Sequence, residues 1–546
     1  MAAHPTGPTW RTRPTTVAGV EFNLADLWES VAAAVPQREA LVFGPRRLTY
    51  GDLEQRANRL AHVMQARGVA AGDRVGLYLH NGNEYIEGML AAFKVRALPV
   101  NVNYRYVADE LRYLLDDSGA RLLIHDDDLT ETVKAVTSSV VSLGSTLATG
   151  EEYEAALAQA SPQAGFAPRS ADDHYVLYTG GTTGMPKGVM WRQEDIFFAA
   201  MGGGNALGPP IKRPEELAPK AVDGRSKCLP ACPFMHGTAH WAAFATLYAG
   251  GTVVVSADQH LRPANLLELV AREEVNLLVI VGDAFARPLV DALEADAALR
   301  DRITSLSVIL SGGAILSPAV KAAMTRLLPS TLLVDGYGAS ETGGQGQMIA
   351  GAAGEGNHPR FVVNDETMVI DEDYRPVEPG SGVVGRVARR GHIPLGYYND
   401  PVKTQATFPV IDGVRWAVPG DFATVEADGT VELLGRGSMS INTGGEKVYP
   451  EEVEAVLKGH PAVFDAVVIG LPDARWGERV VAVIHPRDGQ AAPTAADLAG
   501  HCREALASYK LPRDVVVVGR IVRSPSGKPD YRWAKAQATS ALAGAG

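Results

Sequence analysis

Strand-like and helix-like segments alternate along most of the chain, and this alternation restricts the fold more than any other feature. Apolar residues recur at helical spacing between residues 53 and 64 and again between residues 263 and 275. Such alternation is typical of α/β layers, in which helices connect the strands of mainly parallel sheets. The chain is therefore predicted to have an α/β fold. The runs that predict strands are residues 74–79, 251–255, 276–281, 306–310 and 331–334.

Glycine and proline mark the expected subdivisions of the chain. They become frequent between residues 343 and 396, where short strands and turns predict a smaller β-rich subdomain. A further break falls at residues 435–438, and about 110 residues follow it, enough for one small α/β domain. We therefore expect an N-terminal domain over residues 1–436 and a C-terminal domain over residues 437–546.

Charge and composition argue against several classes of function. The net charge of −12 disfavours nucleic acid as a partner. No apolar run reaches about 18 residues, so no membrane span is expected, and the first residues lack the features of a secretory signal. The cysteines Cys228, Cys232 and Cys502 cannot build a disulfide framework, and the first two alone do not make a zinc site. These features predict a soluble enzyme of the reducing cytoplasm.

One segment, residues 178–188, has the chemistry of a phosphate-binding loop. It contains four glycines, three threonines, a proline and a lysine, and a buried strand is predicted just before it at residues 175–178. Glycines let backbone N–H groups approach an anion, hydroxyls add donors, and Lys187 adds a positive charge. The spacing is not that of a Walker A loop, because Pro186 precedes the lysine and Gly188 follows it. The residues expected to contact phosphates are Thr179, Gly180, Gly181, Thr182, Thr183, Gly184 and Lys187.

A second glycine-rich motif, residues 336–343, follows the strand predicted at residues 331–334. Ligands of open α/β sheets bind beyond the carboxyl ends of strands, so this motif is a candidate binding turn. Tyr337 offers a flat face for an adenine ring, and Glu341 offers an oxygen ligand for Mg²⁺. Taken alone, such a motif is more often a structural turn with a solvated glutamate.

Together the two motifs resemble those of the adenylate-forming enzymes, which include acyl-CoA synthetases, nonribosomal-peptide adenylation domains and firefly luciferase. The resemblance runs from residue 48 to Lys528. It implies a large N-terminal domain of two α/β sheets plus a β-rich subdomain, and a small mobile C-terminal α+β domain. It also implies ATP, Mg²⁺ and coenzyme A as cofactors. The roles that it implies are nucleotide contacts for Gly336, Tyr337 and Ser340, metal binding for Glu341 and Thr182, and a catalytic role for Glu341.

Two shorter motifs extend the resemblance. Residues 311–314 match the stretch that brackets the adenine and lines the acyl pocket, which implies binding roles for Gly313 and Ala314. Residues 233–237 match a motif whose histidine lies near the phosphates and the acyl carboxylate. The resemblance therefore implies a catalytic role for His236.

The next motifs concern the ribose. Residues 416–421 resemble the family's Trp-x-x-Thr-Gly-Asp, with Pro419 in the threonine position. By this resemblance Asp421 would accept hydrogen bonds from the ribose hydroxyls, and Arg436 would contact ribose or phosphate.

The last motifs lie in the expected C-terminal domain. The resemblance implies that Gly444 and Gly445 line the channel for the pantetheine arm of coenzyme A in one domain orientation. The family has Asp or Lys at its hinge, whereas this chain has Ser438, so the hinge assignment is open. Lys528 ends a Pro-x-Gly-Lys motif and would hold the substrate carboxylate against the α-phosphate.

Two segments narrow the expected substrate. Residues 191–196 and 282–288 resemble FadD-type ligases of fatty acids and steroid side chains, and the many small residues near the pocket leave room for a large acyl group. The implied reaction joins a long-chain or steroid side-chain carboxylate to coenzyme A by way of acyl-AMP. Three alternatives remain: acyl transfer to a carrier protein in trans, a luciferase-like oxygenase, and a non-enzymatic ligand sensor. The acid and the oligomeric state stay open, with a homo-oligomer as one alternative.

Overall fold

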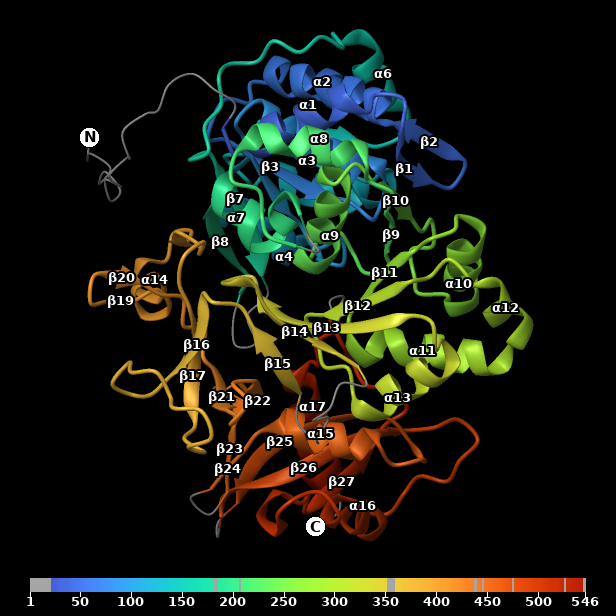
Figure 1. Ribbon diagram of the computed structural model, residues 1–546, viewed down its shortest axis with the longest axis vertical. Coiled ribbons are helices and arrows are strands. Elements are labelled where there is room, and N and C mark those ends of the chain that lie inside the picture. The colour runs from blue at the N-terminus through green and yellow to red at the C-terminus, as the bar shows by residue number, and fades with distance from the viewer. Residues whose placement is uncertain are drawn as a thin grey trace.

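The computed structural model describes residues 21–179, 185–205, 208–350, 359–436, 439–443, 446–473, 476–524 and 527–543, with backbone only for Arg436 and Lys447. The strands in these ranges form five sheets with helices around them, which confirms the predicted α/β class. Figure 1 shows the first sheets at the top, the longest sheet across the middle and the last sheet at the bottom. No helix in these ranges is both long and apolar enough to cross a membrane.

A four-stranded parallel sheet, the N-terminal sheet, has the order β4-β3-β5-β6. The helical pattern from Leu53 to Met64 forms the buried face of α2, and the Thr49 side chain caps that helix by accepting a hydrogen bond from the Asp52 N–H. The elements of this region are α1 (Leu24–Ala34), α2 (Tyr50–Ala66), β3 (Arg74–Tyr78), α3 (Asn83–Lys94), β4 (Leu98–Asn101), α4 (Ala108–Ser118), β5 (Ala120–His125), α5 (Thr130–Thr137), β6 (Ser145–Ala148) and α6 (Glu151–Gln159).

A small antiparallel sheet, the hairpin sheet, carries the candidate phosphate loop. Its strands are β7 (His174–Thr179), β8 (Lys187–Arg192) and β18 (Gly396–Tyr397). Thr179 pairs with Lys187, so the loop joins the two arms of a β-hairpin. The strand predicted at residues 175–178 is confirmed as the centre of β7.

The longest sheet, the mixed sheet, has 13 strands in the order β16-β17-β21-β22-β15-β14-β13-β12-β11-β9-β10-β1-β2. Its parallel part comprises β1 (Glu39–Phe43), β9 (Lys227–Pro230), β10 (Thr252–Val255), β11 (Leu277–Ile280), β12 (Val308–Gly312) and β13 (Leu332–Ala339), with β2 (Arg46–Thr49) antiparallel at the edge. Its helices are α7 (Gln193–Ala200), α8 (Leu217–Val222), α9 (Gly237–Tyr248), α10 (Pro263–Arg272), α11 (Gly282–Ala295), α12 (Ala297–Arg302) and α13 (Pro318–Leu327).

The strands of the predicted β-rich region belong to the mixed sheet. β14 turns back antiparallel on β13, so the mixed sheet continues into the region without a break. The elements are β14 (Gly343–Ile349), β15 (Arg360–Val363), β16 (Thr367–Ile370), β17 (Gly385–Arg389), α14 (Pro401–Thr407), β21 (Asp421–Val425) and β22 (Val431–Arg436), with a two-stranded hairpin of β19 (Val410–Ile411) and β20 (Val414–Arg415).

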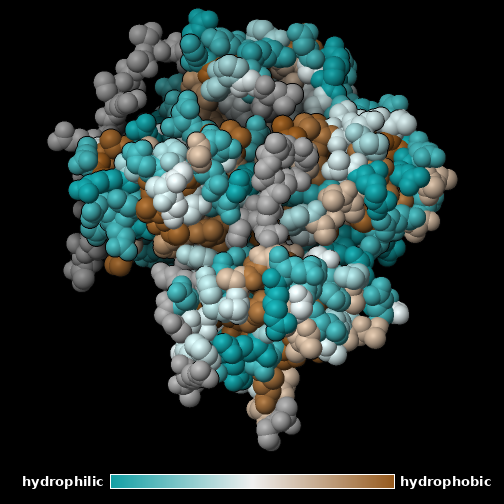
Figure 2. All heavy atoms as spheres, turned by 60° about the horizontal axis from the view of Figure 1, so that its bottom comes forward, coloured by the Kyte–Doolittle hydropathy of each residue, from teal (hydrophilic) through white to brown (hydrophobic). Residues whose placement is uncertain are grey.

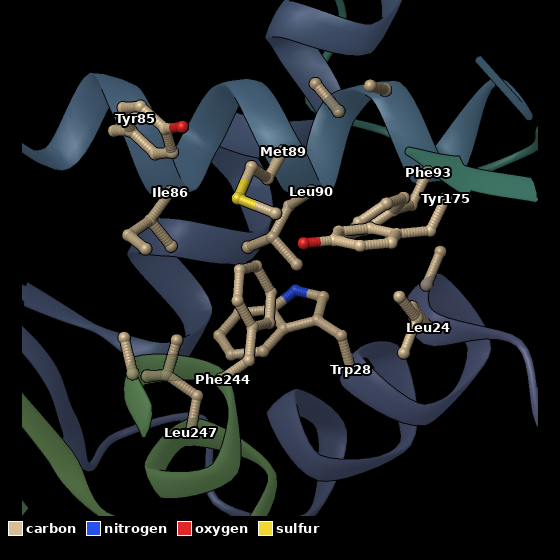
Figure 3. Packing of buried hydrophobic residues seen from close by; sticks show 14 of the residues in the cluster. Leu24, Trp28, Tyr85, Ile86, Met89, Leu90, Phe93, Tyr175, Phe244 and Leu247 are labelled. Atoms are coloured by element: carbon tan, nitrogen blue, oxygen red, sulfur yellow. The ribbon is translucent and has the colours of Figure 1, made fainter. Parts of the chain in front are cut away.

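One buried cluster joins the N-terminal sheet to the elements that carry the site. Figure 3 shows Trp28 and Phe244 packed below α3, with Phe93 and Tyr175 beside them. The ring of Phe93 lies 6.1 Å from that of Phe244 in α9 and 6.5 Å from that of Tyr175 in β7. Aromatic packing of this kind fixes α9 relative to the hairpin sheet.

The C-terminal sheet has five strands, with helices on both faces. α15 and α16 pack on one face through residues such as Val453 and Leu498, and α17 packs on the other through Ala534 and Ala538. The surface of the whole molecule on the side shown in Figure 2 is mostly hydrophilic, with hydrophobic residues in separate groups. The elements are β23 (Ile441–Thr443), β24 (Glu446–Val448), α15 (Pro450–Lys458), β25 (Val463–Asp473), β26 (Gly477–Pro486), α16 (Ala495–Arg503), β27 (Asp514–Val517) and α17 (Tyr531–Ala543).

Candidate active site

A cavity of about 1450 Å³ lies where the mixed sheet, the hairpin sheet and the C-terminal part of the chain meet. The walls come from segments far apart in the sequence, including the ends of β7, β12 and β13, the start of α9 and the loop before α17. The residues predicted for the site that line this cavity are Thr179, His236, Gly313, Gly336, Tyr337, Ser340 and Lys528.

Several predicted residues lie outside the described part of the chain. These are Gly180, Gly181, Thr182, Thr183, Gly184, Ser438, Gly444 and Gly445, and the side chain of Arg436 belongs with them. The backbone of Arg436 pairs with Asp421 across β21 and β22, which brings these two positions together.

Lys187 is the first residue of β8, and it is not among the residues that line the cavity. Its ammonium forms an ion pair with Asp400, the N-cap residue of α14. This hydrogen bond lowers the pKa of the Asp400 carboxyl below its usual range. In this structure Lys187 therefore joins the start of β8 to α14.

Asn101, which belongs to none of the sequence motifs, connects the end of β7 to the segment that carries His236. Its Oδ1 accepts a hydrogen bond from the N–H of Tyr178, and its Nδ2 donates to the backbone oxygens of Tyr178 and Met235, all at 2.7 Å. Asn101 ends the parallel strand β4, so its place at the carboxyl end of a strand was the signal that could have identified it.

The Gly336–Gly343 motif forms the end of β13 and a tight connection to β14. Gly336 and Tyr337 lie inside the strand, because the ladder with β14 extends to Ala339, so the predicted turn is shorter than the motif. The Tyr337 hydroxyl donates to Asp421 Oδ2 at 3.0 Å. This bond joins the residue expected at the adenine to the residue expected at the ribose.

The carboxylate of Glu341 is held from the hairpin sheet. The hydroxyl of Tyr397, in β18, donates to Glu341 Oε1 at 2.8 Å, and Trp191 Nε1 in β8 donates to the backbone oxygen of Ser340 at 3.2 Å. Because β18 pairs with β8, both of these hydrogen bonds come from neighbouring strands of the hairpin sheet.

Gly313 and Ala314 have different surroundings. Gly313 lines the cavity with φ +87°, and a Cβ there would lie 3.2 Å from Thr238 Oγ1. Ala314 is absent from the cavity wall, and its side chain packs against the main core cluster. Ser311, just before them, accepts a hydrogen bond on Oγ from the N–H of Gly282 at 3.0 Å.

His236 and Lys528 lie on the wall of the same cavity. Burial lowers the pKa of the His236 imidazole to about 3, and the Lys528 ammonium adds to this effect. The imidazole is therefore neutral at pH 7. Its Nε2 is buried and makes no hydrogen bond to any residue that the structure describes.

A second histidine, His240, makes a hydrogen bond to the segment that carries His236. His240 Nδ1 donates to the backbone oxygen of Phe234 at 2.6 Å, and its Nε2 pairs with the hydroxyl of Tyr175 at 2.5 Å. Trp241 Nε1 donates to the same hydroxyl at 3.0 Å. The pKa of His240 is lowered to about 4 by burial. These bonds hold the start of α9 in place.

From the polar end the cavity continues into an apolar arm between α9 and the mixed sheet. The helix presents Ala242 and Ala245 to it, and the strands present residues such as Leu277 and Val308. Ala249, just after the helix, also lines the cavity, together with polar residues such as Asp223 and Arg225. Alanines at spacings of three and four lie on one face of a helix. Their small side chains leave this arm open.

Residues 28–398 match the AMP-binding enzyme family, and residues 452–528 match the AMP-binding enzyme C-terminal domain. A 3-oxocholest-4-en-26-oate–CoA ligase of Rhodococcus rhodochrous is 47% identical over 534 residues, which cover 94% of this chain and 96% of the relative. A medium/long-chain-fatty-acid–CoA/3-oxocholest-4-en-26-oate–CoA ligase of Mycolicibacterium smegmatis is 47% identical, with 94% and 96% covered.

Solved structures show the same fold. An anthranilate CoA ligase in complex with anthranoyl-AMP matches with a TM-score of 0.83 at 22% identity, over 96% of this chain and 99% of the other. A Mycobacterium tuberculosis fatty acyl CoA synthetase matches with a TM-score of 0.71 at 25% identity, over 95% and 99%. The chain, with its cavity between the sheets, therefore belongs to the AMP-binding enzyme family.

Proposed function

We propose that this protein is an ATP-dependent acyl-CoA synthetase that activates long-chain fatty or steroid side-chain carboxylates. The observation that carries the proposal is the continuity of the cavity: Lys528 and His236 lie at its polar end, and the apolar arm extends from there along α9. A polar reaction centre joined to a long apolar channel suits an acid with a large hydrocarbon tail. The relatives named above, which act on such acids, support this choice.

The proposed reaction has two halves. In the first, a carboxylate oxygen attacks the α-phosphorus of ATP, the bond to the β-phosphate oxygen breaks, and acyl-AMP and pyrophosphate form. In the second, the sulfur of coenzyme A attacks the acyl carbon, the acyl–phosphate bond breaks, the thiol proton is lost to solvent and AMP leaves. Both halves depend on positioning and electrostatic stabilisation.

The described residues have distinct roles in this proposal. The Lys528 ammonium, on the cavity wall, would lie between the two anions that must meet, the carboxylate and the α-phosphate, and would offset their repulsion. The imidazole of His236 lies on the wall of the same cavity, and because it is neutral it adds no second positive charge beside Lys528. Tyr337 and Asp421, joined by their hydrogen bond, receive the adenosine.

The oxygen ligands expected at the phosphates fit a divalent cation. Glu341 supplies a carboxylate, which Mg²⁺ prefers as a ligand, and Tyr397 orients it. With Thr182 as a second ligand, Glu341 would hold Mg²⁺, which supplies charge neutralisation on the phosphates. The same proposal places the domain boundary at residues 436–437, a hinge near Ser438, the pantetheine channel along Gly444 and Gly445, and the protein in the cytoplasm.

A panel of acids tests the proposal. The purified protein is given ATP, Mg²⁺, coenzyme A and one acid from acetate to palmitate, or a 3-oxo steroid side-chain acid, and AMP release is measured. We expect kcat/KM to rise with chain length, because each buried methylene contributes about 0.8 kcal/mol. Acyl-AMP that accumulates with coenzyme A but turns over with an acyl-carrier protein would overturn the assignment of the acceptor. Highest activity with acetate or benzoate would overturn the assignment of the substrate.

A further inference from the structure

The segment of residues 282–288 contacts the C-terminal part of the chain, and this contact has no role in the reaction as proposed above. Arg287, in α11, is only 4% exposed. Its Nη2 donates to the backbone oxygen of Lys458 at 3.2 Å, and its guanidinium lies 5.9 Å from the ring centre of Phe464. Lys458 is the last residue of α15, where a cation stabilises the negative end of the helix dipole. A buried charge of the N-terminal part therefore binds a helix end of the C-terminal sheet.

Lys458 in turn lies between two carboxylates. Its Nζ is 3.7 Å from Asp283 Oδ2 and 3.9 Å from Asp465 Oδ1, and the Lys458 and Asp283 side chains are 3% and 6% exposed. The N–H of Ser317 donates to Asp283 Oδ1 at 2.8 Å and fixes that carboxylate. Asp283 Oδ2 makes no hydrogen bond to any described residue. The negative charge of Asp283 is therefore balanced by the nearby positive charges of Lys458 and Arg287.

The network continues from Asp465 to the loop that carries Lys528. Arg523 donates to both oxygens of Asp465, at 2.6 and 2.8 Å, and its Nη1 donates to the backbone oxygen of Gly527 at 2.9 Å. Burial raises the pKa of Asp465, but the Arg523 guanidinium outweighs this effect and holds the pKa below its usual range. A Cβ on Gly527 would lie 3.2 Å from Val281 Cγ1 and 3.5 Å from Ala284 Cβ, so Gly527 packs directly beside the 282–288 segment.

We propose that Asp283, Arg287 and Lys458 form a docking latch that holds the C-terminal domain in the orientation in which Lys528 faces the cavity. This inference rests on the proposed function, because it assigns the latch to the adenylation half of that reaction. Rotation of the domain would separate Lys458 from both α11 residues and leave three buried charges to be solvated. Asp283 and Arg287 are thus positioning residues, which act on the reaction through Lys528.

Two variants test the latch, and each half-reaction is measured by itself. Asp283→Asn keeps an acceptor for the Ser317 N–H but removes the charge, and Arg287→Met removes the donor to Lys458. ATP–pyrophosphate exchange reports adenylation, and thioester formation from synthetic acyl-AMP and coenzyme A reports the second half. We expect exchange to fall at least about tenfold, within the usual range of coupling between sites. The fall should appear in kcat with the KM for ATP unchanged, and the thioester rate should be unchanged or higher.

Two further variants separate the latch from a general loss of structure. Arg287→Lys retains a charged donor and should recover most of the exchange rate. Arg326→Gln breaks an exposed ion pair between α13 and α11, with Glu294, and should leave both halves unchanged. An equal fall of both halves in Asp283→Asn, or an unchanged exchange rate, would overturn the latch. Absence of both halves in the unmodified protein would instead refute the proposed function.

Discussion

Replacing Ala245 by phenylalanine should shorten the acid that the protein activates. Ala245 lies on the face of α9 that lines the apolar arm, and Leu277 of β11 lines the same cavity. At 1.5 Å per residue, the lining from Thr238 to Ala249 spans about 16 Å, and Ala245 lies about 10 Å along it. A phenyl ring at this point would fill the arm and leave its far end unused.

The size of the effect follows from the apolar surface that the ring displaces. If three methylenes of a long acid lose their burial, the loss is about 2.4 kcal/mol at about 0.8 kcal/mol each. That corresponds to a decrease of about fiftyfold in kcat/KM, since 1.4 kcal/mol is a factor of ten. Butyrate is too short to reach Ala245, so its kcat/KM should not change.

The assay is AMP release with butyrate and with palmitate, for Ala245→Phe and for Ala66→Phe. Ala66 is an exposed helical alanine at the end of α2, so the second variant adds the same ring outside the cavity. We expect only Ala245→Phe to lower the palmitate-to-butyrate ratio. If the ratio is unchanged, the long acid does not lie along α9, and the argument from the apolar arm is wrong.

Three other changes have definite expected outcomes. Lys528→Ala should lower ATP–pyrophosphate exchange by about 10²–10³, the usual cost of one strong transition-state donor, and should largely spare thioester formation from synthetic acyl-AMP; an equal loss in both halves would contradict this role. Burial holds the pKa of His240 near 4 in the folded protein, whereas an unfolded histidine titrates near 6.5. Between these two pH values the unfolded state binds more protons than the folded state. The free energy of unfolding should therefore fall by about 2 kcal/mol when the pH is lowered from 7 to 5. In denaturant unfolding, His240→Gln should lose about 2 kcal/mol less than the unmodified protein over that interval, and the exposed His260→Gln should match the unmodified protein. Gly445→Leu should spare exchange and abolish thioester formation, and an unchanged thioester rate would remove Gly445 from the pantetheine channel.

Local sequence patterns predicted the class of the fold and many of its strands. Apolar runs and glycine-rich turns are local signals, and they sufficed to predict β3, β7 and β11 within a residue or two. The continuity of the mixed sheet was not predictable in this way, because it depends on pairing between strands that are distant in sequence. For example, β15 pairs with β22, about 70 residues later.

The candidate site shows the same limit. Motifs drew attention to residues with distinctive chemistry, such as Tyr337 and Lys528, and the structure places both on one cavity. Asn101 has no motif, because its importance comes from three hydrogen bonds to backbone groups of other segments. The ion pair of Lys187 with Asp400 likewise joins residues more than 200 positions apart, which no local spacing reveals.

The pairing of β1 with β10 has a consequence for synthesis of the chain on the ribosome. Leu41 pairs with Val253, so one edge of β1 finds its partner only after about 210 further residues have been made. At about 5–20 residues per second, that delay is about 10–40 s. Until then β1 has only its hairpin with β2, and a two-stranded hairpin is marginally stable by itself. The nascent chain therefore exposes an unpaired apolar strand edge for many seconds, which makes this segment a binding site for chaperones and a starting point for aggregation at high expression.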